Sequence, residues 1–248
     1  MPAVDSPVLI VTAIREELDP ILLHFDRLEE ESIGRLRVYR SSVCRAPLVF
    51  AATGDGPSSA EQNARELCER LGPTALLGVG IAGALTPSLS ALDLLAAARI
   101  RNGSGEMIPA DSILLSLATG AGALTGTLVT VAAPVVTIAG KASIARGLPS
   151  AERAAVDMES AAWARAAQLC EVPFLAVRAI SDTAREELPD YLAECVGPKG
   201  GIRRGAVVAR ALRRPSSIPA LLHWKRRVSD CGEKLAAFLW DYFDCGRW

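Results

Sequence analysis

Residues 154–184, AAVDMESAAWARAAQLCEVPFLAVRAISDTA, place a helical pattern directly before a strand-like run. Apolar residues recur in steps of three and four from Glu159, at Ala162, Trp163, Ala166 and Cys170, which is the spacing of one helix face. The pattern predicts one amphipathic helix over residues 154–170, with Glu159 directed toward the interior at its first turn. The run VPFLAVRAI at 172–180 then predicts a strand. A carboxylate facing the interior calls for a polar partner.

The same alternation of strands and helices extends through the rest of the chain. Strand-like runs stand at residues 8–14, 46–53 and 74–85, and helical patterns at residues 15–25, 60–71, 201–214 and 219–243. The first of these runs, VLIVTAI, is unbroken in apolar residues, as expected of a strand covered on both faces. The alternation predicts an α/β fold with a largely parallel sheet under helices on both sides. Without an internal repeat or a low-complexity linker, we expect one domain over 1–248, with a helical C-terminal part over about 203–248.

Composition excludes several classes of function. The chain has 248 residues and a net charge of −1, so it lacks the basic field that nucleic-acid binding requires. Its six cysteines form no CxxC pair and have no histidine near them, so we expect neither a zinc site nor a disulfide framework, and no metal. No basic segment precedes the first strand, which indicates a cytoplasmic protein without a signal peptide.

An uncharged stretch over residues 112–140 is long enough to span a bilayer. Its glycines, its proline and the turn-like Gly-Ala-Gly at 120–122 argue against one continuous helix. The β-branched run LVTVAAPVVTIA is typical of a strand. We therefore predict a short helix, a turn and a buried strand here.

Polar residues and glycines follow each predicted strand, where α/β folds bind ligands. They are Glu16 and Glu17, then Gly54, Asp55 and Gly56, then Gly80, Ala82 and Gly83, and finally Ser181 and Asp182. We expect Glu17, Glu159 and Asp182 to converge on one site walled by glycine-rich backbone. Carboxylates crowded together without a metal-binding histidine indicate acid–base chemistry on a neutral polar molecule.

Five motifs resemble the nucleoside phosphorylase superfamily, in its order along the chain: VTAIREEL, TGDGPSSAEQNA, GVGIAGALTPSLSALDLL, AVDMESAAWARAA and VPFLAVRAISDTA. The resemblance covers roughly residues 8–185. It is to the branch that holds purine nucleoside phosphorylases and methylthioadenosine/adenosylhomocysteine nucleosidases. It implies a single α/β domain around a mixed, mostly parallel, barrel-like sheet flanked by helices. The implied reaction is cleavage of a purine N-glycosidic bond, and dimers of the family imply a homodimer.

The resemblance also implies roles for individual residues. Asp182 would protonate the purine at N7, with Ser181 orienting it, and Glu17 would take a proton from the attacking water. Glu159 would accept hydrogen bonds from the ribose hydroxyls while Met158 packs on the sugar. The backbone wall around the substrate would be formed by Gly54, Ile81, Ala82 and Gly83.

Each role has a structural alternative. Glu159 can instead pair with Arg178 or cap a turn, and Asp182 can cap a helix that starts at TAREEL. Asp157, three positions before Ser160, has the spacing of a helix N-cap. Glu17 can be an ordinary first-turn acid favoured by the helix dipole, and the glycines can serve tight turns.

Water is favoured over phosphate as the nucleophile. Ile81 stands where phosphorylases place a Ser or Thr hydroxyl, and no arginine stands beside TGDGP. Phosphate as a co-substrate stays open, and no other cofactor is expected. Two further alternatives are a phosphate-dependent purine nucleoside phosphorylase and a nucleoside-binding regulatory protein without turnover.

Two segments depart from the nucleosidases. Residues 133–154 lack the aspartate and the phenylalanine of the family's base-binding loop, which leaves open whether the base is adenine or another purine. The tail after Asp182 resembles the hopanoid-associated members of the superfamily, which are linked to removing adenine from adenosylhopane. That tail suits an apolar 5′ substituent, with methylthioadenosine or adenosylhomocysteine salvage as the alternative. The aromatic end at 238–248 can close a core or a dimer interface, or touch a membrane surface.

Overall fold

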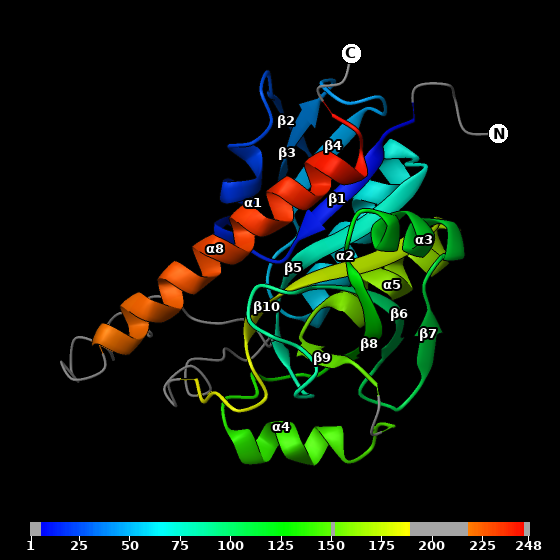
Figure 1. Ribbon diagram of the computed structural model, residues 1–248. Helices are drawn as coiled ribbons and strands as arrows, with labels where there is room; N and C mark the ends of the chain where they lie inside the picture. Colours follow the sequence, from blue (N-terminus) through cyan, green and yellow to red (C-terminus); the bar gives the residue numbers. More distant parts are fainter. Residues whose placement is uncertain (1–5, 150–151, 189–217, 246–248) are drawn as a thin grey trace.

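The structure is a computed structural model that describes residues 6–149, 152–188 and 218–245 (Figure 1). The strands are β1 (Val8–Thr12), β2 (Glu29–Ile33), β3 (Leu36–Ser41), β4 (Leu48–Ala52), β5 (Ala75–Ala84), β6 (Leu94–Arg101), β7 (Met107–Pro109), β8 (Leu124–Thr130), β9 (Ala154–Asp157) and β10 (Phe174–Asp182). The helices are α1 (Arg15–Leu22), α2 (Pro57–Leu71), α3 (Ser112–Gly120), α4 (Ile138–Ala145), α5 (Ser160–Leu169) and α8 (Ile218–Tyr242).

The sheet closes on itself over part of its width. Strands β10, β6, β8, β9 and β5 follow one another, and pairing of β10 with β5 closes them into a ring. From β5 the sheet continues outward through β1, β4, β3 and β2. Strand β5 pairs parallel with β1 and β10 but antiparallel with β9, so the sheet is mixed. The predicted α/β fold with a barrel-like sheet is confirmed.

Helices cover both faces of the sheet (Figure 1). Leu9 and Val11 of β1 face a core shared with α2 and α5, while Ile10 faces a second core shared with α1 and α8. Successive residues of a strand point to opposite faces of the sheet. Because helices cover both faces, both sets of side chains are buried. The aromatic residues Phe238, Trp240, Tyr242 and Phe243 near the chain end belong to the second core.

The structure corrects the predicted start of the central helix. Residues Ala154–Asp157 form strand β9, which pairs with β5 and β8, and helix α5 begins only at Ser160. Alanine favours helix over strand, so pairing with β5 and β8 overrode the local preference. The Asp157 carboxylate accepts the Ser160 amide (3.0 Å), which fixes the point where the helix begins.

The uncharged stretch behaves largely as predicted. It forms α3, a turn and β8, but the strand ends at Thr130 and the residues from Ile138 onward belong to α4. The Gly140 amide donates to Thr137 Oγ1 (3.0 Å), which caps α4. Pro134 lies within the predicted strand and cannot donate to a strand ladder. Within the described part of the chain, no helix is long and apolar enough to cross a membrane.

The expectation of no disulfide was wrong. Cys44, after β3, and Cys245, after α8, form a disulfide with their Cα atoms 4.2 Å apart. The two cysteines are 201 residues apart in sequence, and only the packing of α8 across the sheet brings them together. No group of potential metal ligands gathers among the residues described. The helix predicted over 219–243 is present as α8, whereas the one predicted over 201–214 lies outside the described residues.

Candidate active site

The second half of β5 joins the predicted acids into one region. The Ile81 amide donates to Glu17, and Gly83 lies against the Asp182 carboxylate, so two acids flank the same four-residue length of strand. Glu159 interacts electrostatically with Glu17. Several residues here keep partial solvent access while the strands that lead to them are buried, namely Gly54, Ile81, Gly83, Met158 and Glu159. Ala82 is buried, and its carbonyl oxygen lies 3.3 Å from Ser181 Oγ.

Glu17 lies in the first turn of α1 and is held by two main-chain amides. Ala13 N–H donates to its Oε2 (3.2 Å) and Ile81 N–H to its Oε1 (3.1 Å). Gly80 allows this approach, because a Cβ there would lie 2.9 Å from Oε1. Burial raises the pKa of the Glu17 carboxyl, an effect opposed by the charge of Arg178 and by the amide hydrogen bonds. Glu17 is a first-turn acid of α1, as the alternative had it, but it is buried and held by main-chain amides.

Glu159 occupies the N-cap position of α5 but does not cap the helix. Its Oε1 instead accepts a hydrogen bond from the Gly56 amide (3.1 Å), in the loop between β4 and α2. Burial, followed by the neighbouring charge of Asp157, raises the pKa of Glu159 to about 8. The carboxyl therefore holds a proton at neutral pH until a partner favours its ionised form.

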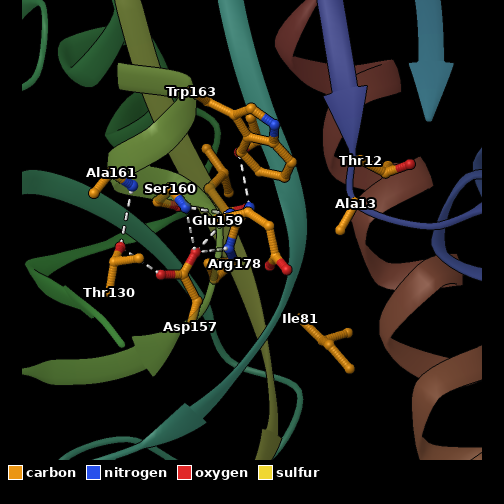
Figure 2. A network of polar contacts seen from close by, with 12 residues as sticks. Thr12, Ala13, Ile81, Thr130, Asp157, Glu159, Ser160, Ala161, Trp163 and Arg178 are labelled. Atoms are coloured by element: carbon orange, nitrogen blue, oxygen red, sulfur yellow. Dashed lines mark hydrogen bonds and ion pairs between the residues drawn. The ribbon is translucent and has the colours of Figure 1, made fainter. Parts of the chain in front are cut away.

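Arg178 pairs with Asp157 and not with Glu159. Its Nε (3.1 Å) and Nη2 (2.8 Å) both donate to Asp157 Oδ2, and Thr130 Oγ1 donates to Oδ1 (2.8 Å). Figure 2 shows Thr130, Asp157, Ser160 and Arg178 joined in this network, with Trp163 beside it and Ala13 and Ile81 across from it. Asp157 thus does more than the N-cap role expected of it, because it also neutralises a buried arginine.

All five N–H groups of Arg178 are used within the protein. Beyond the bonds to Asp157, Nη2 donates to Ser160 Oγ (2.6 Å), and Nη1 donates to the carbonyls of Gly78 (3.0 Å) and Val177 (3.3 Å). The guanidinium carbon also lies 4.8 Å from the centre of the Trp163 ring. Such a saturated guanidinium has no donor left for a ligand.

Asp182 is the last residue of β10, and its carboxylate is almost wholly buried. Ser181 Oγ donates to Oδ1 at 2.6 Å. Gly83 makes room for the carboxylate, since a Cβ there would lie 2.8 Å from Oδ2. Residues 183–188 form a turn and no helix, so the alternative that Asp182 caps a helix directly after it does not hold for these residues.

Lys141 of α4 was missed by sequence reasoning. The side chain is fully buried and its Nζ forms an ion pair with Asp182 Oδ2. The one available signal was that Lys141 is the first charged residue after the long uncharged stretch 112–140. Nothing in that spacing indicates which carboxylate it meets.

Three arginines line a separate hollow on the surface. Arg15, Arg35 and Arg37 surround a space of about 350 Å³ together with Leu18, Leu36 and Ala52. Arg15 is already paired with Asp19 and Tyr39. It precedes Glu17 by two residues on α1 and so points to a different side of the helix. The hollow does not bring a guanidinium to the three carboxylates.

Comparisons with known proteins show the family to which the chain belongs. Residues 7–213 match the family model described as the phosphorylase superfamily. A 5′-methylthioadenosine/S-adenosylhomocysteine nucleosidase of Listeria monocytogenes is 26% identical over 204 residues, which cover 72% of this chain and 87% of that protein. One from Desulfotalea psychrophila is 24% identical over 199 residues, covering 71% and 84%.

Solved structures share the fold. The nucleosidase of the same name from Neisseria meningitidis, in complex with methylthio-immucillin-A, superposes with a TM-score of 0.74 at 20% identity, covering 96% of this chain and 98% of the other. Futalosine hydrolase of Helicobacter pylori gives a TM-score of 0.75 at 20% identity, covering 97% and 98%.

Proposed function

The chain belongs to the phosphorylase superfamily, and we propose that it cleaves the N-glycosidic bond of a purine nucleoside with water as the nucleophile. The observation that carries the proposal is that the carboxyl groups of Glu17 and Asp182 lie against one short length of β5, with Glu159 interacting electrostatically with Glu17. In the reaction the C1′–N9 bond breaks and its electron pair leaves with the base. The water oxygen bonds to C1′.

Glu159 binds the sugar in this proposal. Its carboxylate accepts hydrogen bonds from the ribose 2′ and 3′ hydroxyls, and Met158 packs against the ring. The raised pKa of about 8 means that the unliganded carboxyl holds a proton near neutrality. Two hydroxyl donors favour the ionised form, so binding of a nucleoside releases that proton. Bound sugar and free proton thus compete for one carboxylate.

Glu17 acts as the general base and takes one proton from the attacking water. Its two oxygens are already oriented by the amides of Ala13 and Ile81, which leaves the carboxylate fixed before the substrate arrives. The neighbouring Ile81 offers no side-chain hydroxyl. The backbone of Gly54, Ala82 and Gly83 completes the wall of the site.

Asp182 delivers a proton to purine N7, which makes the base a better leaving group. Ser181 fixes the orientation of the carboxyl through Oδ1. Protonation at N7 and water attack at C1′ occur at opposite ends of the glycosidic bond. The proposal accordingly gives Asp182 and Glu17 separate roles on either side of it.

The positions and hydrogen bonds of the arginines favour hydrolysis over phosphorolysis. A phosphate dianion needs cationic donors within hydrogen-bond reach. Arg178 is saturated, and the hollow lined by Arg15, Arg35 and Arg37 opens to a different side of α1. We therefore infer that phosphate is not required.

A 5′-substituted adenosine is the substrate class that the relatives' names support. The nucleosidases of Listeria monocytogenes and Desulfotalea psychrophila are named for 5′-methylthioadenosine and S-adenosylhomocysteine, so a 5′ thioether of adenosine is the first candidate. An apolar 5′ substituent such as that of adenosylhopane is the second, and it rests on the tail, whose residues 189–217 lie outside the described residues. A homodimer in the cytoplasm remains part of the proposal.

The test is release of free base from methylthioadenosine, adenosylhomocysteine and an adenosine with a hydrocarbon 5′ group, each with and without phosphate. Hydrolysis predicts equal rates in both buffers, and strict dependence on phosphate would refute it. Asp182→Asn should lower release by orders of magnitude while nucleoside affinity, measured by calorimetry, is retained. Asp111→Asn, which removes the N-cap acid of α3, is the matched control and should retain the rate. Nucleoside binding without release in the wild type would instead indicate a binding protein.

A further inference from the structure

Lys141 satisfies all its hydrogen-bonding capacity inside the protein. Its Nζ donates to Asp182 Oδ2, to the Thr183 carbonyl (2.7 Å) and to the Glu186 carbonyl (2.8 Å). An ammonium has three N–H donors and no acceptor, so three acceptors use it fully. The lysine has no donor left for a substrate, and any effect on the reaction passes through Asp182.

These acceptors also fix the charge of the pair. A neutral amine has only two N–H groups, and three acceptors around Nζ therefore require the protonated form. A buried ammonium is stable only beside an opposite charge. Asp182 supplies it, and the two side chains rest as an ion pair in which the carboxylate is an anion.

Lys141 is also the buried residue of an otherwise half-exposed helix. It is the buried member of α4, and Ile138 at the start of that helix is 41% exposed. Figure 1 shows α4 below the strand ring in that view, apart from the other helices. Ile144 and Ala145 of α4 pack against a small apolar cluster, so α4 is held both by that contact and by the buried ion pair of Lys141 with Asp182.

We propose, on the basis of the function proposed above, that Lys141 is a positioning residue that keeps Asp182 ionised and oriented between turnovers. Asp182 then takes up a proton from bulk solvent as the nucleoside binds, and passes it to N7 as the C1′–N9 bond breaks. Glu17 gives back to the solvent the proton that it took from the attacking water, so no net proton is consumed. The carboxylate returns to its pair with Lys141, and no other reactant is needed.

Other titratable groups surround Asp182 and have to be separated from the lysine. Arg227 of α8 donates to the Ser181 carbonyl (3.3 Å), and Cys231 of α8 interacts electrostatically with Asp182. Glu186 lies in the following turn, where its carboxylate accepts the Thr183 amide at 2.8 Å. Glu17 lies against β5 at Gly80. The experiment therefore compares variants at Lys141 with one at Glu186.

The test measures kcat and KM for base release separately in the wild type, Lys141→Met, Lys141→Gln and Lys141→Arg. Lys141 has no donor left for a substrate, so Lys141→Met and Lys141→Gln should lower kcat at least about tenfold and leave KM within about twofold, as Asp182 loses its orientation. Lys141→Arg keeps a cation beside the carboxylate and should recover part of kcat. Glu186→Ala disturbs the turn but keeps the carbonyl that Lys141 uses, so its kcat should stay within about twofold of the wild type.

An unchanged kcat in both Lys141→Met and Lys141→Gln, or a loss that Lys141→Arg does not recover at all, would overturn the proposal. Should the variants not fold, the wild type decides by 15N NMR of the lysine Nζ. An ammonium signal protected from exchange, and altered in Asp182→Asn, supports the ion pair, and its absence overturns it. This signal does not depend on turnover. A wild type that releases no base refutes the proposed function, and the NMR result still decides whether the pair exists.

Discussion

Replacing Glu159 with glutamine should stabilise the unliganded protein while it removes sugar binding. The amide oxygen of glutamine can still accept the hydrogen bond from Gly56, so packing in the loop before α2 is preserved. What the substitution removes is the ionisable group, whose pKa is raised from 4.5 to about 8 by burial and by the charge of Asp157. The stability difference must therefore depend on pH.

The sign follows from where the proton is held. Below pH 4.5 the carboxyl is neutral in both the folded and the unfolded chain, and the two proteins differ little. As the pH rises toward 8 the unfolded chain ionises while the folded one keeps its proton, so the wild type loses stability until the folded pKa is passed. At ~1.4 kcal/mol per pH unit the upper limit is about 5 kcal/mol.

Because Glu159 is only half-buried, solvent screening reduces this limit, and we expect about 2 kcal/mol above pH 8. For a chain of this size that corresponds to a rise in Tm of about 4–8 °C. Thermal unfolding followed by circular dichroism at pH 5 and pH 8.5 measures it. Glu186→Gln is the control, and it should lower Tm at pH 8.5. The Thr183 amide lowers the pKa of Glu186, so the ionised carboxylate stabilises the folded protein there. Equal Tm differences at both pH values would refute the reasoning.

Three further substitutions test the packing around the site. Gly83→Ala places a Cβ 2.8 Å from Asp182 Oδ2, and base release should fall about tenfold or more with little change in Tm. Asp157→Asn leaves the buried guanidinium of Arg178 without its anion, which should cost about 3–5 kcal/mol in urea unfolding. Cys44→Ser opens the disulfide and should cost about 2–4 kcal/mol in oxidising buffer, with no difference from the wild type under reducing conditions.

Periodicity predicted the elements whose burial is regular. Strands β1, β4, β5 and β10 are covered on both faces, so their sequences are nearly continuous apolar runs. Helices α1, α2, α5 and α8 bury one stripe each and show the 3.6-residue pattern.

The outer hairpin of β2 and β3 could not be predicted in the same way. Strand β2 has the sequence EEESI, and four of its five residues are exposed, so no apolar alternation marks it. It is held by backbone pairing with β3 at the edge of the sheet. Strand β9 was not predicted for a different reason. Its alanines continue the apolar spacing of α5, so the two segments together matched the pattern of one helix.

Sequence reasoning named the strand-end acids but could not assign their partners. Asp157 and Arg178 are 21 residues apart, and Lys141 and Asp182 are 41 apart. Each pair meets only because the ring of strands closes. No local pattern distinguishes a carboxylate that will be neutralised from one that will not.

Whether a buried carboxylate is neutralised by a cation bears directly on the proposed mechanism. Two buried cations neutralise Asp157 and Asp182, whereas Glu17 and Glu159 form no ion pair with any described residue and have raised pKa values. A neutral hydrogen-bond donor can stabilise the ionised form of a carboxyl that has no ion pair and a raised pKa, and it does so without adding charge to the site. Water and ribose hydroxyls are such donors, and they are the groups that the proposed reaction brings to Glu17 and Glu159. An anionic substrate group would instead repel both once they ionise, which is a second reason, independent of the arginines, for water in place of phosphate.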